Sequence, residues 1–213
     1  MAELTLETPV GPVPARLEGS GRTGVLLATG AGTGQDHPGV AGLRTRLAAA
    51  GLLVMTFEYA YRAAGRRSPD PAAKLLVVHR AAAEHLRSLV GQSLVLAGRS
   101  MGGRMSTMLA AEGQPCAAVV VYGYPLHPAG RPDRLRVEHL GDMDVPVLLV
   151  SGTNDALAGR DLAEEYLAPL PSATLIWVEG ANHSFRRKGT PADEMLDHLT
   201  ELTADWLAGL SLL

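Results

Sequence analysis

Short, uninterrupted runs of apolar residues recur along the chain and alternate with longer amphipathic stretches. Such continuous runs are typical of strands that are buried on both faces of a sheet. The runs span Gly24–Thr29, Leu52–Glu58, Leu94–Ala97, Ala117–Tyr122, Val145–Ser151 and Ala173–Val178. The stretches between and after them, from Pro38 to Ala50, Pro71 to Val90, Arg104 to Ala111, Leu157 to Leu167 and Ala192 to Leu210, favour helices. Strands that alternate with helices predict a doubly wound, mostly parallel sheet of the α/β class.

The N-terminal segment has a different pattern. Residues 4–8 and part of 13–18 alternate apolar and polar side chains, with two prolines and a glycine between them. This predicts an antiparallel hairpin at a sheet edge, where proline is tolerated. The longest connection, residues 123–144, is too short for a separate lid domain. At 213 residues we expect one domain over residues 1–213, without a lid.

Charge and cysteine content exclude several classes of protein. A net charge of -3 provides no electrostatic footprint for nucleic acid. No apolar run approaches the roughly 18 residues of a membrane span, and the first residues are acidic rather than basic as in a signal peptide. We therefore expect a cytoplasmic monomer or homodimer that binds neither nucleic acid nor membrane. Cys116, the only cysteine, is predicted to be a buried structural thiol.

The glycine-rich stretch around Ser100 has the pattern of a nucleophile elbow. The strand at residues 94–97 runs into GRSMG at residues 98–102, a GxSxG sequence followed by a helix-forming segment. A serine on a sharp strand-to-helix turn needs small neighbours, because larger side chains would collide with adjacent elements. We expect Ser100 to be an exposed nucleophile. The alternative is an ordinary turn with a serine N-cap.

Two further polar side chains follow two later strands. Asp155 comes after the strand that ends at Ser151, and His183 after the strand that ends at Val178. Ligand sites in parallel sheets lie at the carboxyl ends of strands, so we expect both side chains near Ser100. His183 would then remove the serine proton, while Asp155 fixes the imidazole tautomer and stabilises the imidazolium. Individually, Asp155 could instead cap a turn, and His183 could be an ordinary loop residue, one of seven histidines.

Backbone N–H groups near Ser100 are candidates for an oxyanion hole. Acyl transfer places negative charge on the carbonyl oxygen, which such groups stabilise. The expected donors are Met101, directly after the nucleophile, and Ala31, with Gly32 as second choice, in the glycine-rich loop after the first central strand. A tight turn is the alternative role for these glycines.

The sequence indicates neither a metal nor a cofactor. No pair of His, Asp or Glu has the spacing and placement of metal motifs, and residues 30–35 complete neither GxGxxG nor a P-loop. His37 is a candidate for the pocket mouth or a second base. Several arginines could attract an acidic acyl group or simply be solvated: Arg99, Arg104, Arg131, Arg134 and Arg136.

The chain resembles the α/β-hydrolase superfamily over nearly its whole length. GRSMGG, SGTNDAL and ANHSF occur in that superfamily's order of serine, acid and histidine. More narrowly, the chain is similar to the small lidless branch related to dienelactone hydrolases. It most resembles proteins similar to the α/β-hydrolase-like subunit of a eukaryotic histone acetyltransferase complex, through residues 28–38 and 122–140. Dienelactone hydrolases typically carry cysteine where this chain has Ser100, and the closer family tends to carry histidine at Thr29.

These features predict a serine hydrolase that cleaves a small ester or thioester through an acyl-enzyme on Ser100. A lidless chain predicts an open, shallow site that does not suit long-chain lipids. One alternative is a non-catalytic binding or scaffolding module that retains the fold. Another is a cofactor-free perhydrolase, similar to haloperoxidases, which would use the same three side chains.

Overall fold

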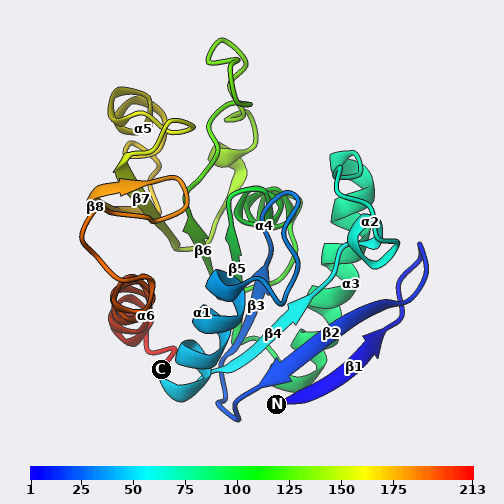
Figure 1. Cartoon of the computed structure of the whole chain (residues 1–213). Coiled ribbons are helices and arrows are strands. Elements are labelled where there is room, and N and C mark those ends of the chain that lie inside the picture. Colours follow the sequence, from blue (N-terminus) through cyan, green and yellow to red (C-terminus); the bar gives the residue numbers. More distant parts are fainter.

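Eight strands form one twisted sheet in the order β1-β2-β4-β3-β5-β6-β7-β8 (Figure 1). The structure is a computed structural model that describes residues 1–213. Strand β2 pairs antiparallel with both β1 and β4, and all other pairs are parallel. The strands are β1 (Ala2–Leu6), β2 (Val13–Glu18), β3 (Gly24–Ala28), β4 (Leu53–Phe57), β5 (Leu94–Arg99), β6 (Ala118–Tyr122), β7 (Val147–Asn154) and β8 (Ala173–Asn182). The predicted mostly parallel sheet with an N-terminal antiparallel hairpin is confirmed.

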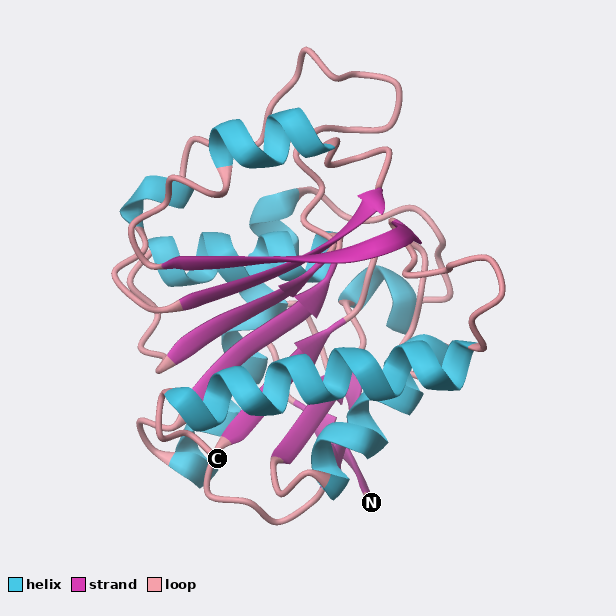
Figure 2. Ribbon diagram, turned by 90° about the vertical axis from the view of Figure 1, so that its left-hand side faces the viewer, coloured by secondary structure: helices cyan, strands magenta, loops and turns pink.

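Helices cover both faces of this sheet (Figure 2). They are α1 (Pro38–Ala49), α2 (Ala60–Ala63), α3 (Ala72–Val90), α4 (Met101–Ala111), α5 (Arg160–Tyr166), α6 (Ala192–Gly209) and the 3-10 helix η1 (Leu140–Asp142). Helices α1 and α6 pack against one face, and α3 and α4 against the other. None of the helices combines the length and apolar character needed to cross a bilayer.

The continuous apolar runs are explained by burial on both faces. In β5, Leu94 and Leu96 face α3 and α4, whereas Val95 and Ala97 face α1 and α6. All four are fully buried. Complete burial of a leucine or valine stabilises the folded chain by about 1.5–3 kcal/mol, so a polar residue anywhere in this strand would be costly.

The structure differs from the predicted elements mainly at their ends. The sequence predicts that α4 begins at Arg104, because the glycines before it are poor helix formers. In the structure the helix begins at Met101 and includes these glycines, because close packing leaves no room for a side chain there. Strand β8 continues to Asn182, where it still pairs with the end of β7. The short helix α2 and η1 were not predicted. The connection between β6 and β7 contains only η1 and forms no lid domain.

Candidate active site

Ser100 lies on a strained turn between β5 and α4, at the carboxyl edge of the sheet. Its φ of 49° and ψ of -114° are unusual for a residue with a side chain. A Cβ at Gly98 would lie 2.4 Å from the backbone of Gly103, and one at Gly102 would lie 2.6 Å from the carbonyl oxygen of Ala28. The two glycines of the GxSxG sequence are therefore required by contact with neighbouring backbone.

The Ser100 side chain does not cap the helix that follows it. No hydrogen bond joins its hydroxyl to an N–H group of α4. The hydroxyl oxygen lies 2.8 Å from Nε2 of His183, and Nδ1 of the same imidazole lies 2.8 Å from Oδ2 of Asp155. The structure thus brings all three predicted side chains into one hydrogen-bonded chain.

Asp155 is held firmly at the end of this chain. Its side chain is completely buried, directly after β7, and its second carboxylate oxygen accepts the N–H of Leu157 at 2.8 Å. One oxygen is thereby fixed by the backbone, which leaves the other directed at the imidazole. His183 keeps about a quarter of its side chain exposed, at 23%. The imidazole is therefore accessible while its orienting carboxylate is not.

The turn that carries His183 is fixed from two sides. The side-chain oxygen of Asn182 accepts the N–H groups of Ser184 and Arg186, each at 3.0 Å. A Cβ at Gly123, after β6, would lie 3.4 Å from Nδ1 of His183, so this part of the backbone packs closely against the imidazole. These supporting residues were not identified from the sequence, although asparagine is a common turn former.

The glycine-rich loop after β3 lies beside the nucleophile. A Cβ at Gly30 would lie 3.8 Å from Cβ of Ser100. The N–H of Gly32 donates to the Tyr61 hydroxyl at 3.2 Å, whereas the N–H of Ala31 forms no hydrogen bond within the chain. Met101 opens α4, where an N–H has no partner inside its own helix. Met101 and Ala31 thus offer free donors near Ser100, and Gly32 does not.

Other candidate residues have structural surroundings. His37 forms no hydrogen bond with Ser100: it caps α1, with Nδ1 accepting the N–H of Gly39 at 3.2 Å. Burial, together with the nearby charges of Arg99 and Arg186, lowers the pKa of His37. Burial raises the pKa of Cys116 to about 11, so this thiol stays protonated and unreactive at neutral pH.

The candidate arginines differ in their contacts. Arg99 donates to the carbonyl oxygen of Ser184 at 3.1 Å, which ties the His183 turn to β5. None of the candidate arginines forms an ion pair, which holds equally for Arg104, Arg131, Arg134 and Arg136. Nowhere do three or more His, Cys, Asp or Glu side chains converge as metal ligands would.

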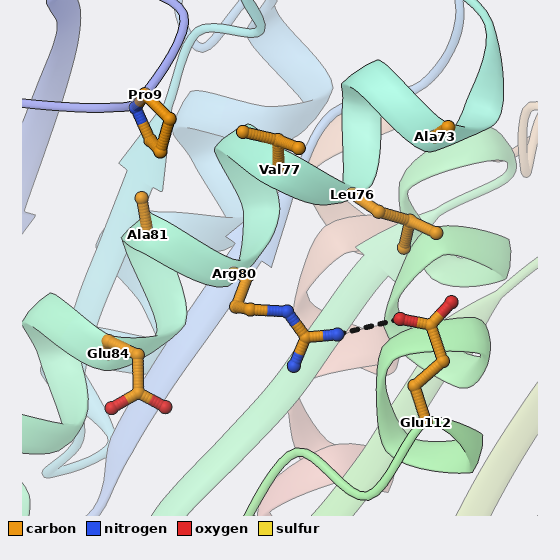
Figure 3. Close-up of a pocket in the computed structure, with 8 residues that line it drawn as sticks. All are labelled: Pro9, Ala73, Leu76, Val77, Arg80, Ala81, Glu84 and Glu112. Atoms are coloured by element: carbon orange, nitrogen blue, oxygen red, sulfur yellow. Dashed lines mark hydrogen bonds and ion pairs between the residues drawn. The ribbon is translucent and has the colours of Figure 1, made fainter.

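An open surface hollow of about 560 Å³ lies along α3 (Figure 3). Pro9 lies at one end of it, and an ion pair of 2.6 Å between Arg80 and Glu112 crosses the other. Neither Ser100 nor His183 lines this hollow.

Comparison with solved structures identifies proteins of similar fold. The chain is similar to an α/β serine hydrolase homologue from Coxiella burnetii, with a TM-score of 0.77 at 20% identity over 97% of both chains. It is similar to a lidless α/β serine hydrolase from Xanthomonas campestris (TM-score 0.77, 23% identity, 98% of this chain and 94% of that one). A dienelactone hydrolase from Anabaena variabilis is a third (TM-score 0.77, 21% identity, 98% and 96%).

At these identities the solved structures establish a shared fold. The family assignment rests on a separate match, to the family described as alpha/beta hydrolase domain, over residues 21–208. That match includes β3 with its glycine-rich loop and ends within the last turn of α6, so Ser100, Asp155 and His183 all lie within it. The chain therefore belongs to the α/β-hydrolase family.

Proposed function

We propose that this protein is a serine hydrolase that cleaves a small ester or thioester through an acyl-enzyme on Ser100. The observation that carries the proposal is the hydrogen-bonded chain from Ser100 through His183 to Asp155, with both contacts at 2.8 Å. The strained backbone of Ser100 supports it, because strain of this kind concentrates at functional sites. Membership of the α/β-hydrolase family supports the class of reaction.

In the first half-reaction, the hydroxyl oxygen of Ser100 attacks the substrate carbonyl carbon and its proton passes to Nε2 of His183. The Nδ1 proton of His183 remains donated to Asp155, which stabilises the imidazolium. The N–H groups of Met101 and Ala31 donate to the developing oxyanion. The intermediate then collapses to the acyl-enzyme, and the departing alcohol or thiol takes the proton from His183.

In the second half-reaction, water attacks the acyl carbon of the ester on Ser100. His183 accepts the water proton as a base and returns it to the serine oxygen when the carboxylic acid departs. The same imidazole thus acts as base and then acid in each half. Metal and cofactor have no role in this sequence.

A small substrate is supported by the surroundings of Ser100. The β6–β7 connection contributes only η1, so no lid domain adds apolar walls to the site. A long acyl chain needs extended apolar walls to remove its surface from water. Short-chain esters and thioesters are therefore the proposed substrates.

The proposal is tested by incubating the protein with a fluorophosphonate and measuring the intact mass. We expect a single covalent adduct on the parent protein and none on Ser100→Ala. Ser88→Ala is the matched control, because Ser88 is an exposed serine near the far end of α3, and it should be labelled like the parent. Short- and long-chain ester and thioester panels then define the acyl preference.

The absence of an adduct on a folded parent protein would refute the proposal and favour a binding or scaffolding module. The resemblance to the histone acetyltransferase-complex subunit rests on residues 28–38 and 122–140 and stays a prediction. Hydrolysis products and peracid formation, measured on the unlabelled parent protein, separate an esterase from a perhydrolase.

A further inference from the structure

The glycine-rich loop after β3 is held by the segment that follows β4. The N–H of Gly32 donates to the hydroxyl oxygen of Tyr61 at 3.2 Å, and the N–H of Gln35 donates to Oε1 of Glu58 at 2.8 Å. A Cβ at Gly34 would lie 2.5 Å from Oε1 of Glu58, so the loop packs directly on this carboxylate. Two side chains from one short segment therefore fix both halves of the loop.

Tyr61 is anchored well enough to position a neighbour. It is fully buried and stacks on Tyr59, with ring centroids 6.3 Å apart and planes inclined by 18°. The Tyr59 hydroxyl lies 3.0 Å from Nδ1 of His79 and forms no hydrogen bond with Tyr61 or with the loop. Burial raises the pKa of Tyr61 and keeps its hydroxyl protonated.

Thr29, at the start of the loop, provides no comparable support. Its hydroxyl oxygen is buried and has no hydrogen-bond partner. Thr29 therefore does not orient the loop through its side chain. The Thr33 hydroxyl donates to the carbonyl oxygen of Gly30 at 2.9 Å within the loop, and Tyr61 and Glu58 hold the loop from outside it.

We propose that Tyr61 is a positioning residue, which selects the oxyanion donor by occupying the N–H of Gly32 and leaving that of Ala31 free. This inference rests on the proposed function, because an oxyanion forms only if Ser100 is acylated. An N–H already donated to a buried phenol is not available to a second acceptor at full strength. The free donors at the nucleophile are then Ala31 and Met101, which approach it from two different elements.

Removal of the phenolic oxygen should reduce the stabilisation of the transition state and leave substrate binding nearly unchanged. In Tyr61→Phe the loop loses one of its two anchors from outside the loop, while the Thr33 hydroxyl still donates to the carbonyl oxygen of Gly30. The peptide that links Ala31 and Gly32 then loses its fixed direction, which displaces Ala31. Loss of a single oxyanion donor lowers kcat by about 10²–10³-fold. Because Ala31 is displaced rather than removed, we expect a decrease of about 10–100-fold in kcat, with KM changed less than about twofold.

The experiment compares Tyr61→Phe with Tyr59→Phe. Each variant removes one hydroxyl from a fully buried tyrosine of the same stacked pair, but the Tyr59 hydroxyl faces His79 and not the loop. Three quantities are measured on both variants and the parent: kcat and KM for 4-nitrophenyl acetate, the rate of fluorophosphonate labelling, and amide hydrogen exchange of Gly32 by NMR. Core amides such as that of Val120 report any change in global stability.

The inference predicts slower turnover, slower labelling and faster Gly32 exchange in Tyr61→Phe, with parent-like values for all three in Tyr59→Phe. Equal kcat in the two variants, or unprotected Gly32 exchange in the parent, would overturn it. A parent protein that the fluorophosphonate does not label would refute the proposed function itself. An active, labelled parent with an unaffected Tyr61→Phe variant would refute only the role of Tyr61.

Discussion

Individual atoms of Asp155 determine how the candidate site is oriented. One carboxylate oxygen is occupied by the N–H of Leu157, and the other lies against Nδ1 of His183. Nδ1 must therefore carry a proton, which leaves Nε2 as the acceptor for the hydroxyl of Ser100. The tautomer that a general base requires thus follows from how the aspartate is held.

Asp155→Asn should preserve the structure and abolish most activity. The asparagine oxygen can still accept the N–H of Leu157, but the amide then donates toward His183 and favours the wrong tautomer. For a serine-histidine-aspartate arrangement this change lowers kcat by about 10⁴-fold. Steady-state kinetics with 4-nitrophenyl acetate checks the prediction, with Asp161→Asn, an exposed residue of α5, as the control. Equal rates for the two variants would contradict it.

The side chains of the candidate site were easier to predict from the sequence than the hydrogen bonds that hold them. Ser100, Asp155 and His183 could be predicted to meet, because residues directly after parallel strands share one edge of a sheet. The preference for Ala31 over Gly32 could not be checked in this way, because the hydrogen bond that occupies the Gly32 N–H comes from Tyr61, in another part of the chain.

The turn between β5 and α4 packs too tightly to accept a larger residue. Gly98→Ala should therefore destabilise the protein by more than about 2 kcal/mol, because backbone must move to admit the new Cβ. Gly141→Ala is the matched control, since a Cβ there meets nothing within 4 Å. Urea unfolding measures both free energies. Equal stabilities for the two variants would show that the turn adapts without cost.

Element boundaries were the least predictable feature of the fold. Glycines in the first turn of α4 have low helix propensity, so the sequence pattern places the start of this helix too late. Tertiary contact overrides that preference, because only glycine fits against Ala28 and Val121 at these positions. The end of β8 was placed too early for a related reason, since its last residues pair with β7 and carry no apolar pattern of their own.

For the molecule as a whole, apolar continuity was sufficient to predict the layered architecture. Every strand from β3 to β7 is buried almost throughout, and the alternation with helices left few possible topologies. The buried polar groups inside the two apolar layers could not be predicted from this pattern. His79, on α3, is completely buried between the hydroxyls of Tyr59 and Ser106, at 3.0 and 3.4 Å.

This imidazole should make the stability of the whole molecule depend on pH. Burial, with a smaller effect of Arg80, lowers the pKa of His79 from 6.5 to about 3. The unfolded chain therefore binds a proton below pH 6.5 that the folded chain resists. The stability that depends on a neutral His79 is fully present above pH 6.5. As the pH falls toward 3, the free energy of unfolding decreases by about 1.4 kcal/mol per pH unit.

Urea unfolding at several pH values between 6.5 and 4 checks this prediction. His79→Gln should flatten the decline in unfolding free energy, whatever its stability at neutral pH, because the variant has no imidazole to protonate at this position. His85→Gln, on the exposed side of α3, should keep the slope of the parent. His139, whose pKa is lowered to about 4 mainly by burial, contributes to the decline in all three proteins and cancels in the comparison. Equal slopes for His79→Gln and the parent would mean that the folded protein accommodates a charged imidazole within its core.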